Sequence, residues 1–217
     1  MNECCTTHKS PSGTAAFFSH HSRRYAKRFR RSGLEKAQEY LLTGIKSEPI
    51  LGNSILDIGC GVGQLHLTLL REGAERAVGV DLSPDMLHEA QKFAETFGLS
   101  ERTQYLEGDF TQLAHSVPES DITVLDRVVC CYEDLTNLLH TSTGKTRRVF
   151  ALSHPKENLV MEGVFKAQVF LARLFKWGFR PFWHNWGEMK LKILSLGFEL
   201  VYENSTFGWQ VLVFRRV

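Results

Sequence analysis

Three glycines at alternate positions begin two residues after an acidic residue in the first third of the chain. Asp57 ends an apolar stretch and precedes Gly59, Gly61 and Gly63. Glycines allow a sharp turn from a strand into a helix, and they leave room for a ligand where a Cβ would clash. Because the Asp57 carboxylate attracts an amine and repels a phosphate, the expected ligand carries a positive charge.

A second acidic residue, Asp81, ends the next apolar stretch, 77–80. It follows Asp57 by the length of one strand–helix–strand unit, where an acid can accept hydrogen bonds from both hydroxyls of a ribose. The glycine pattern is G-x-G-x-G, whereas a pyrophosphate-binding turn has G-x-G-x-x-G. The sequence therefore predicts a nucleoside with a cationic tail and disfavours a nicotinamide-dependent reductase.

The block 56–63, LDIGCGVG, resembles motif I of the class I S-adenosylmethionine-dependent methyltransferases. The stretch 79–84, GVDLSP, resembles the motif that follows it in this family. The resemblance covers the chain from about residue 52 to its end and is most specific over 56–132. It implies methyl transfer as the reaction and S-adenosyl-L-methionine as the cofactor.

The resemblance also implies a cofactor-binding set at the carboxyl ends of the strands. The glycines would pass under the methionine part, Asp81 would hold the ribose and Asp109 would accept from the adenine amine. The full set is Asp57, Gly59, Gly61, Gly63, Asp81, Leu82, Met86, Asp109, Phe110 and Asp126. From the residues alone, Asp109 could instead cap a loop, and Met86 could equally belong to the core.

The methyl acceptor is expected at the end of the fourth strand, where residues 125–132 read LDRVVCCY. The absence of a [D/N]-P-P-[Y/F] sequence argues against methylation of a nucleobase nitrogen. This segment, the arginine-rich stretch 23–31 and Gly33-Leu34 resemble a bacterial group related to magnesium-protoporphyrin O-methyltransferases, which esterify a propionate side chain. The resemblance implies a small acceptor that is flat and acidic.

Two kinds of acceptor oxygen remain open. A carboxylate needs only a cation to position it, and Arg127 or Arg30 would serve. A hydroxyl needs a general base, for which Tyr132 and His154 are the candidates. The predicted catalytic set is Asp126, Arg127, Tyr132 and His154. A protein of this fold that binds the cofactor without turnover is the alternative function.

Two further segments could contact ligands or partners. Aromatic and basic residues alternate in the first, which suits a flat acidic ligand, a contact with the N-terminal helix or a membrane surface. Its members are Arg173, Lys176, Trp177, Phe179, Arg180, Phe182, Trp183 and Trp186. The second is the basic stretch 23–31, which contains six Lys or Arg and no acid. RNA or membrane contact by this stretch is less favoured than a solvated helix, and no DNA binding is expected.

Length and composition set the organisation. The 217 residues are 43% hydrophobic with a net charge of +2, which suits one globular domain. We expect a flexible leader over 1–19, a cap of basic helices over 20–50 and a methyltransferase domain over 51–217. The sequence shows neither an apolar run long enough for a transmembrane helix nor an apolar signal core. Five cysteines, at 4, 5, 60, 130 and 131, lack zinc-site spacing, so a reduced, cytoplasmic protein without metal is expected.

The order of elements predicts an α/β fold with a Rossmann-like, doubly wound sheet of seven strands. Parallel strands are expected at 54–58, 77–81, 103–107, 121–126 and 147–153. Helices are expected at 20–31, 34–42, 64–72, 84–97, 135–140, 161–175 and 186–196. The strands 198–204 and 209–214 would close the sheet as a C-terminal antiparallel hairpin.

Overall fold

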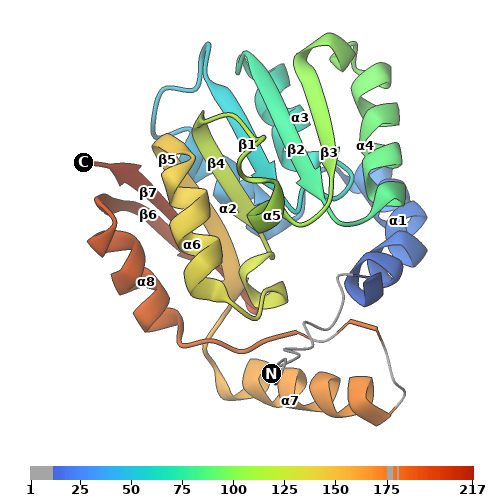
Figure 1. The fold of residues 1–217 in the computed structure, drawn as a ribbon, viewed down its shortest axis with the longest axis vertical. Coiled ribbons are helices and arrows are strands. Elements are labelled where there is room, and N and C mark those ends of the chain that lie inside the picture. The colour runs from blue at the N-terminus through green and yellow to red at the C-terminus, as the bar shows by residue number, and fades with distance from the viewer. Residues whose placement is uncertain (1–11, 175–177, 180) are drawn as a thin grey trace, which may run out of the picture.

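The computed structural model describes residues 12–174, 178–179 and 181–217 (Figure 1). Seven strands form one sheet in the order β3-β2-β1-β4-β5-β7-β6. The strands are β1 Ser54–Ile58, β2 Arg76–Asp81, β3 Thr103–Glu107, β4 Ser120–Asp126, β5 Thr146–Pro155, β6 Phe198–Ser205 and β7 Trp209–Arg216. The helices are α1 Ser12–Ser32, α2 Lys36–Ile45, α3 Gln64–Arg71, α4 Pro84–Thr96, α5 Phe110–Leu113, α6 Leu135–Gly144, α7 Leu159–Leu174 and α8 Trp186–Ser195, with short 3₁₀ turns η1 Ser100–Arg102 and η2 Val129–Cys131.

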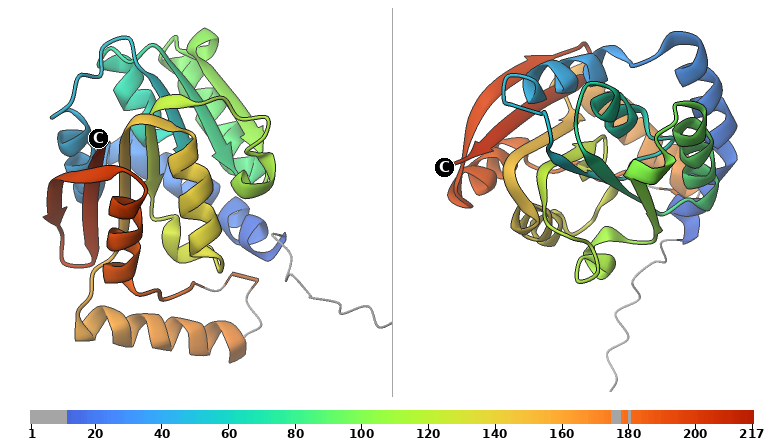
Figure 2. Two further views of the ribbon diagram at one scale, coloured as in Figure 1. Left: turned by 60° about the vertical axis from the view of Figure 1, so that its left-hand side comes forward. Right: turned by 90° about the horizontal axis from the view of Figure 1, so that it is seen from above.

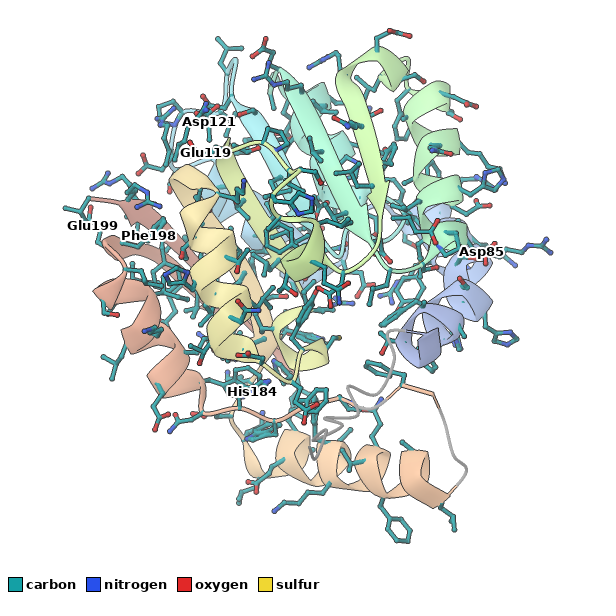
Figure 3. The ribbon with its side chains drawn as sticks, in the orientation of Figure 1. Asp85, Glu119, Asp121, His184, Phe198 and Glu199 are labelled. Atoms are coloured by element: carbon teal, nitrogen blue, oxygen red, sulfur yellow. The ribbon has the colours of Figure 1, made fainter. Side chains whose placement is uncertain are left out.

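Strands β1 to β5 are parallel, and their carboxyl ends lie at one edge of the sheet. All five residues of β1 are buried, which is typical of a parallel strand covered on both faces. At the opposite edge Asp121 accepts hydrogen bonds from the backbone N–H of Ser54 at 2.9 Å and from its hydroxyl at 2.7 Å. Figure 3 shows Asp121 at this amino edge and His184 beyond the carboxyl edge.

Strand β7 lies between β5 and β6 and is antiparallel to both. Phe198 and Glu199, labelled in Figure 3, begin β6 at the outer edge of the sheet. The predicted fold class, a mostly parallel seven-stranded sheet that ends in an antiparallel hairpin, is confirmed.

Helices cover both faces of the sheet (Figures 1 and 2). Helices α1 to α4 pack on one face, and α5, α6 and α8 pack on the other. Neighbouring residues of β1 point to opposite faces of the sheet. Ile55 packs in the apolar cluster that includes residues of α1 to α4, and Leu56 packs in the cluster that includes residues of α5, α6 and α8. The remaining long helix, α7, lies beyond the carboxyl edge of the sheet, where a ligand site is expected.

Helix α1 begins at Ser12 and not at the predicted His20. Phe17 and Phe18 explain the difference, because both rings pack against Phe179, with centroid distances of 5.0 and 5.3 Å. A partner so distant in the sequence leaves no local signal. Residues 1–11 of the predicted leader, with Cys4 and Cys5, lie outside the described residues.

None of the helices within the described ranges combines the length and apolar character that a bilayer crossing requires.

Candidate active site

The glycine loop between β1 and α3 has a left-handed backbone at each glycine. The φ angles of Gly59, Gly61 and Gly63 are 66°, 54° and 84°. An added Cβ at Gly59 would lie 2.4 Å from Val128 Cγ2, whereas at Gly61 it would meet nothing within 4 Å. The backbone N–H of Gly59 donates to the carbonyl of Val80 at 2.7 Å. The loop therefore lies against the end of β2 and leaves open space at Gly61.

Asp81 holds this loop from the neighbouring strand. Its Oδ2 accepts from the backbone N–H of Gly61 at 2.8 Å, and its Oδ1 accepts from that of Ser83 at 2.8 Å. Burial raises the pKa of the Asp81 carboxyl to about 6, although the backbone donors act in the opposite direction. Each carboxylate oxygen has two acceptor positions, so capacity remains for two hydroxyl donors.

Asp57 belongs to a buried chain of polar side chains beneath the loop. Its Oδ2 lies 2.8 Å from His66 Nδ1, and His66 Nε2 lies 3.1 Å from the Tyr105 hydroxyl. His66 is fully buried and Asp57 nearly so. The pairing satisfies both buried groups and fixes the orientation of the Asp57 carboxylate.

A cavity of about 390 Å³ lies at the carboxyl edge of the sheet. Ten of the predicted site residues line it: Asp57, Gly59, Gly61, Asp81, Leu82, Met86, Phe110, Asp126, Arg127 and Tyr132. Its other walls come from α1, the start of α2 and α7, through residues that include Phe17, Phe18, Glu35, Gln38, Met161, Phe165 and Gln168. Gly63, Asp109 and His154 lie outside the lining.

Asp109 caps helix α5 in this structure. Its Oδ1 accepts from the backbone N–H of Thr111 at 2.9 Å and from the hydroxyl of Tyr132 at 3.1 Å. Burial, with the nearby Asp109, raises the pKa of the Tyr132 phenol far above its ordinary value. Tyr132 is thus a hydrogen-bond donor to Asp109, and its phenol is difficult to ionise.

His154 is buried beside the cavity and not in its wall. Its Nδ1 lies 2.9 Å from the carbonyl oxygen of Pro155, and its ring stacks on Trp186 at 4.8 Å. Burial lowers its pKa to about 4. The third predicted residue outside the lining, Gly63, is the N-cap of α3.

Arg127, directly after β4, supplies the cation of the cavity wall. Its Nη2 donates to Glu35 Oε2 at 2.6 Å, and its guanidinium carbon lies 4.8 Å from the centre of the Trp209 ring. Burial acts to lower the pKa of Arg127, but Asp126 and Glu35 outweigh it and the pKa is raised. The Nε atom is buried and has no hydrogen-bond partner among the described residues.

Asp126 joins the cap to the sheet. Its Oδ2 accepts from Gln38 Nε2 at 2.9 Å, and its Oδ1 accepts from the Ser153 hydroxyl at 2.6 Å. The Ser153 hydroxyl oxygen in turn accepts from the backbone N–H of Arg127 at 2.9 Å. This network fixes the start of α2 over the end of β4.

The cap residues Glu35 and Gln38 were not among the predicted site residues. The local signal was present, because an acid followed three residues later by Gln marks a helix N-terminus, and Gln38 accepts from the backbone N–H of Glu35 at 3.0 Å. That signal places a helix start but does not reveal the distant partners of the two side chains.

The two adjacent cysteines and the aromatic segment also adjoin the cavity. Cys130 and Cys131 line it, and both thiols point to the carbonyl oxygen of Arg127, at 3.6 and 3.4 Å. Phe179 lines it as well, whereas Lys176, Trp177 and Arg180, and the side chain of Arg173, lie outside the described part of the chain. Within the described residues no cluster of His, Cys, Asp or Glu could hold a metal ion.

Residues 55–151 match the family model described as a methyltransferase domain. The ribosomal protein L11 methyltransferase of Escherichia coli (strain 55989 / EAEC) is 32% identical over 79 residues, which are 36% of this chain and 27% of the relative. The chain spans about a quarter of the length of such curated relatives.

Solved structures match most of the chain. The magnesium protoporphyrin IX methyltransferase ChlM from Synechocystis PCC 6803, with bound S-adenosylhomocysteine, is 20% identical, has a TM-score of 0.72 and covers 95% of this chain and 99% of its own. The [4+2]-cyclase SpnF is 13% identical, with a TM-score of 0.73 and coverage of 95% and 97%. Both likenesses show the fold.

S-adenosylmethionine is the cofactor of this domain family, and the residues of the cavity fit it. Gly61 leaves the open space that a bound nucleoside requires, and Asp81 keeps free acceptor positions for ribose hydroxyls. Asp57 supplies a negative charge for an amino-acid ammonium group. The methyltransferase-domain match of residues 55–151, the sheet order and the likeness to the solved structures agree: the chain has the fold of S-adenosylmethionine-dependent methyltransferases, and the residues of its cavity suit that cofactor.

Proposed function

We propose that this protein transfers a methyl group from S-adenosylmethionine to an oxygen of a small organic acceptor, and that the acceptor oxygen belongs to a carboxylate. The observation that carries this proposal is the buried Nε of Arg127, in the wall of the cavity that also contains the glycine loop. Among the described residues this Nε has no hydrogen-bond partner, and its ion-pair partner Asp126 Oδ1 lies 3.9 Å away. A buried N–H without a partner is costly. An acceptor carboxylate would satisfy it and would be positioned by the guanidinium charge.

Asp57, Asp81 and the glycine loop would hold the cofactor, whose sulfonium supplies an activated methyl group. The chain's own contribution is to orient the acceptor and to exclude water. Phe17 and Phe18 of α1 and Phe165 of α7 suit this role, because they close the cavity with apolar side chains.

The geometry supports a carboxylate over a hydroxyl because neither candidate base is well placed. The Tyr132 hydroxyl donates a hydrogen bond to Asp109, and the raised pKa of its phenol opposes ionisation. His154 lies outside the cavity lining. Of the two candidate cations, Arg127 lines the cavity, whereas Arg30 is exposed and its guanidinium lies 5.6 Å from the centre of the Phe93 ring.

The similar structure from Synechocystis is named for magnesium protoporphyrin IX, so flat carboxylic acids are the first acceptors to test. Arg127 and Trp209 in the cavity wall suit this class, because the guanidinium carbon lies 4.8 Å from the centre of the Trp209 ring and the pair offers one cationic and one aromatic contact.

A second candidate is a protein that binds the cofactor without transferring its methyl group. The observation in its favour is Glu35, which already occupies Nη2 of Arg127 at 2.6 Å and would compete with an acceptor carboxylate. The similar fold of a [4+2]-cyclase agrees with this reading, since one fold can host different reactions.

Two measurements test the proposal in sequence. Calorimetric titration with S-adenosylhomocysteine should show binding that Asp81→Ala weakens about tenfold to a hundredfold, because hydrogen bonds to a charged group are lost. The control is Asp85→Ala, which removes an exposed acid in the first turn of α4 (Figure 3). No binding by the unaltered protein would reject the cofactor assignment.

The second measurement is transfer of labelled methyl to flat carboxylic acids and to hydroxylated aromatics of similar size. Base-labile label on the carboxylic acids supports the proposal, because methyl esters hydrolyse in base and methyl ethers do not. Label on the hydroxylated compounds alone would refute the carboxylate assignment. Tight cofactor binding without transfer to either group would favour the second candidate.

A further inference from the structure

The guanidinium of Arg127 offers two donors on one side, Nε and Nη2, and these donors differ in their partners. Nη2 donates to Glu35 Oε2 at 2.6 Å, whereas Nε is buried without a hydrogen-bond partner among the described residues. Asp126 Oδ1, at 3.9 Å from Nε, lies beyond hydrogen-bond distance. Nε and Nη2 together form the fork with which arginine binds both oxygens of a carboxylate. Half of this fork is therefore open.

Glu35 holds the other half of the fork with one of its two oxygens. Its Oε2 accepts from Arg127, and its Oε1 accepts from Nη1 of Arg28 on α1 at 2.9 Å. The side chain of Glu35 is 13% exposed and lines the cavity, whereas that of Arg28 is 57% exposed and lies outside the lining. Glu35 thus connects a donor in the cavity wall to a cation near the surface.

Arg127 is held more firmly than Glu35. Its backbone has a φ of 60°, a left-handed conformation that is costly for a residue with a Cβ and persists where the surroundings enforce it. Its backbone N–H donates to the Ser153 hydroxyl at 2.9 Å, and its guanidinium carbon lies 4.8 Å from the centre of the Trp209 ring. Glu35 precedes the first residue of α2, and its ion-pair partners are long side chains. A rearrangement here would therefore move the Glu35 side chain and leave the fork in place.

We propose that Glu35 is a specificity-determining residue, which holds Nη2 of Arg127 in the free protein and yields it to the carboxylate of the methyl acceptor. This inference rests on the proposed function, because it concerns the same acceptor site. The acceptor carboxylate takes Nε with one oxygen and Nη2 with the other, while Glu35 keeps its contact with Arg28. The exchange gives Nε the partner that the described residues do not supply.

This exchange favours a carboxylate over an acceptor group with a single oxygen. A hydroxyl group can occupy one donor, so it leaves Glu35 on Nη2 and gains one hydrogen bond. A carboxylate replaces the ion pair that it breaks with another of the same charge and adds the hydrogen bond to Nε. Between turnovers, Glu35 gives Arg127 a second counter-charge beside Asp126, because a buried guanidinium is costly without one. Glu35 would thus select both the charge and the shape of the acceptor group.

Arg28 is a positioning residue in this exchange. It contacts Oε1 of Glu35 in the free protein, and it is the cation that remains with Glu35 after Arg127 has changed partner. Without Arg28, a displaced Glu35 would lose both of its arginine contacts, so the displacement would cost more. Replacement of Arg28 should therefore weaken acceptor binding, although Arg28 lies outside the lining of the cavity.

The first test is calorimetric titration of the full chain, saturated with S-adenosylhomocysteine, with 2-naphthoate and with the neutral 2-naphthamide. Glu35→Gln should lower the dissociation constant for 2-naphthoate by about threefold to tenfold, because an internal competitor reduces apparent affinity by the fraction of time that it holds the site. Arg28→Ala should raise this constant by about threefold, the range expected for a partly exposed ion pair. The dissociation constant for the amide should stay unchanged in both variants.

The double variant E35Q/R28A separates the exchange from a general loss of positive charge. If Arg28 acts through Glu35, the double variant should bind 2-naphthoate as Glu35→Gln does, so the two effects should not add. The matched controls are Arg31→Ala, which removes an exposed cation from α1, and Glu39→Gln, which alters an exposed acid in the first turn of α2. Both controls should bind 2-naphthoate as the unaltered protein does. Additive effects in the double variant, or equal changes in the controls, would overturn the inference.

Circular dichroism and S-adenosylhomocysteine binding should be unchanged in every variant. If Glu35→Gln fails to fold, Arg28→Ala and Arg31→Ala decide the question on their own. A loss of 2-naphthoate affinity in Arg28→Ala alone would support the exchange, and an equal loss or no loss in the two variants would overturn it.

Methyl transfer distinguishes failure of this inference from failure of the proposed function. In Glu35→Gln the KM for a carboxylic acid acceptor should fall while kcat stays the same, because the exchange acts on binding and not on the activated methyl group. Transfer to carboxylic acids without the changes in binding would overturn the exchange and leave the proposed function intact. The changes in binding without transfer would support the exchange and refute carboxylate methylation. Absence of 2-naphthoate binding in both the unaltered protein and Glu35→Gln would overturn the exchange.

Discussion

The carboxylates at the ends of β1 and β2 have different environments, although both line the cavity. Asp57 is paired with the buried His66 at 2.8 Å, whereas Asp81 accepts from backbone N–H groups. A backbone amide carries no full charge that would offset the cost of burying a carboxylate. The raised pKa of Asp81 is the result.

This shift predicts a pH dependence of cofactor binding. Because protonated Asp81 loses an acceptor for the ribose hydroxyls, S-adenosylhomocysteine should bind more tightly as pH rises through about 6 and reach a plateau above it. Below that value the dissociation constant should rise by up to about tenfold per pH unit. Calorimetric titration from pH 5 to 8 measures the effect, and Asp81→Asn should remove the dependence.

The free energy of unfolding of the cofactor-free protein should fall as pH rises, whereas cofactor binding should strengthen. The Asp81 carboxyl has a pKa of about 6 in the folded chain, against an ordinary value of 3.8. The folded state therefore binds the proton more tightly, and this contribution to the free energy of unfolding is lost as pH rises from about 4 through 6. Urea denaturation of the cofactor-free protein between pH 4 and 7 measures this decrease in the free energy of unfolding. Asp81→Asn should remove this pH dependence.

Replacement of the two candidate bases should have little effect on methyl transfer to a carboxylate. Tyr132→Phe and His154→Gln should each keep kcat within about threefold, because a carboxylate acceptor needs no general base. Loss of a working general base would instead lower kcat by about a hundredfold to ten-thousandfold. Tyr132→Phe should also lower the free energy of unfolding by about 1 kcal/mol, since its hydrogen bond to Asp109 is lost. A kcat loss beyond a hundredfold in either variant would indicate a hydroxyl acceptor.

The acids and glycines of the site were predictable because they follow strands, and the carboxyl ends of parallel strands meet at one edge. The partners of Asp126 and Arg127 were not. Gln38 is 88 residues before Asp126, and Glu35 is 92 residues before Arg127. Only tertiary packing brings such pairs together.

At the scale of elements, α2 packs on the hairpin through a glycine. An added Cβ at Gly44 would lie 2.5 Å from Tyr202 Cδ1 and 2.6 Å from Val213 Cγ2. Gly44→Ala should therefore lower the free energy of unfolding by about 1–3 kcal/mol, the usual cost of overpacking. Urea denaturation measures this change.

The matched control for this prediction is Gly144→Ala. Gly144 ends α6, and an added Cβ there meets nothing within 4 Å. Alanine should be neutral or should stabilise α6 by up to about 1 kcal/mol, because glycine is a weak helix former. Equal losses in both variants would show that close packing at Gly44 is not the cause.

The strands were predictable to within two residues because apolar runs and glycines mark them clearly. The sequence prediction 54–58 equals β1, and 103–107 equals β3. Strand β5 extends to Pro155, two residues past the prediction, because His154 and Pro155 pair with Gln210 and Trp209 of β7. A strand end that depends on its neighbour in the sheet leaves no signal of its own.

At the scale of the whole molecule, the cavity is closed by elements outside the matched domain, residues 55–151. Helices α1 and α2 precede it and α7 follows it, yet all three contribute to the lining. The glycine loop, Asp57 and Asp81 lie within the matched domain, whereas these three helices lie outside it. This division explains why the sequence predicted the cofactor more readily than the acceptor.

Ligand binding should stabilise the entire fold. S-adenosylhomocysteine at about a hundred times its dissociation constant should add about 2.7 kcal/mol to the free energy of unfolding. For a chain of this length the expected rise in Tm is roughly 5–10 °C. Differential scanning fluorimetry measures it. NAD at the same concentration should cause no shift, and a larger shift with NAD would revive the dinucleotide alternative.

The place of β7 in the sheet bears on how the protein is made. Strand β6 leaves the ribosome first, but its one strand partner among the described residues is β7, which in turn fills the gap beside β5. Until residues 209–216 emerge, a nascent chain exposes one edge of β5 and an unpaired β6. Exposed edges recruit other strands, so chaperone protection should matter most before β7 has joined the sheet.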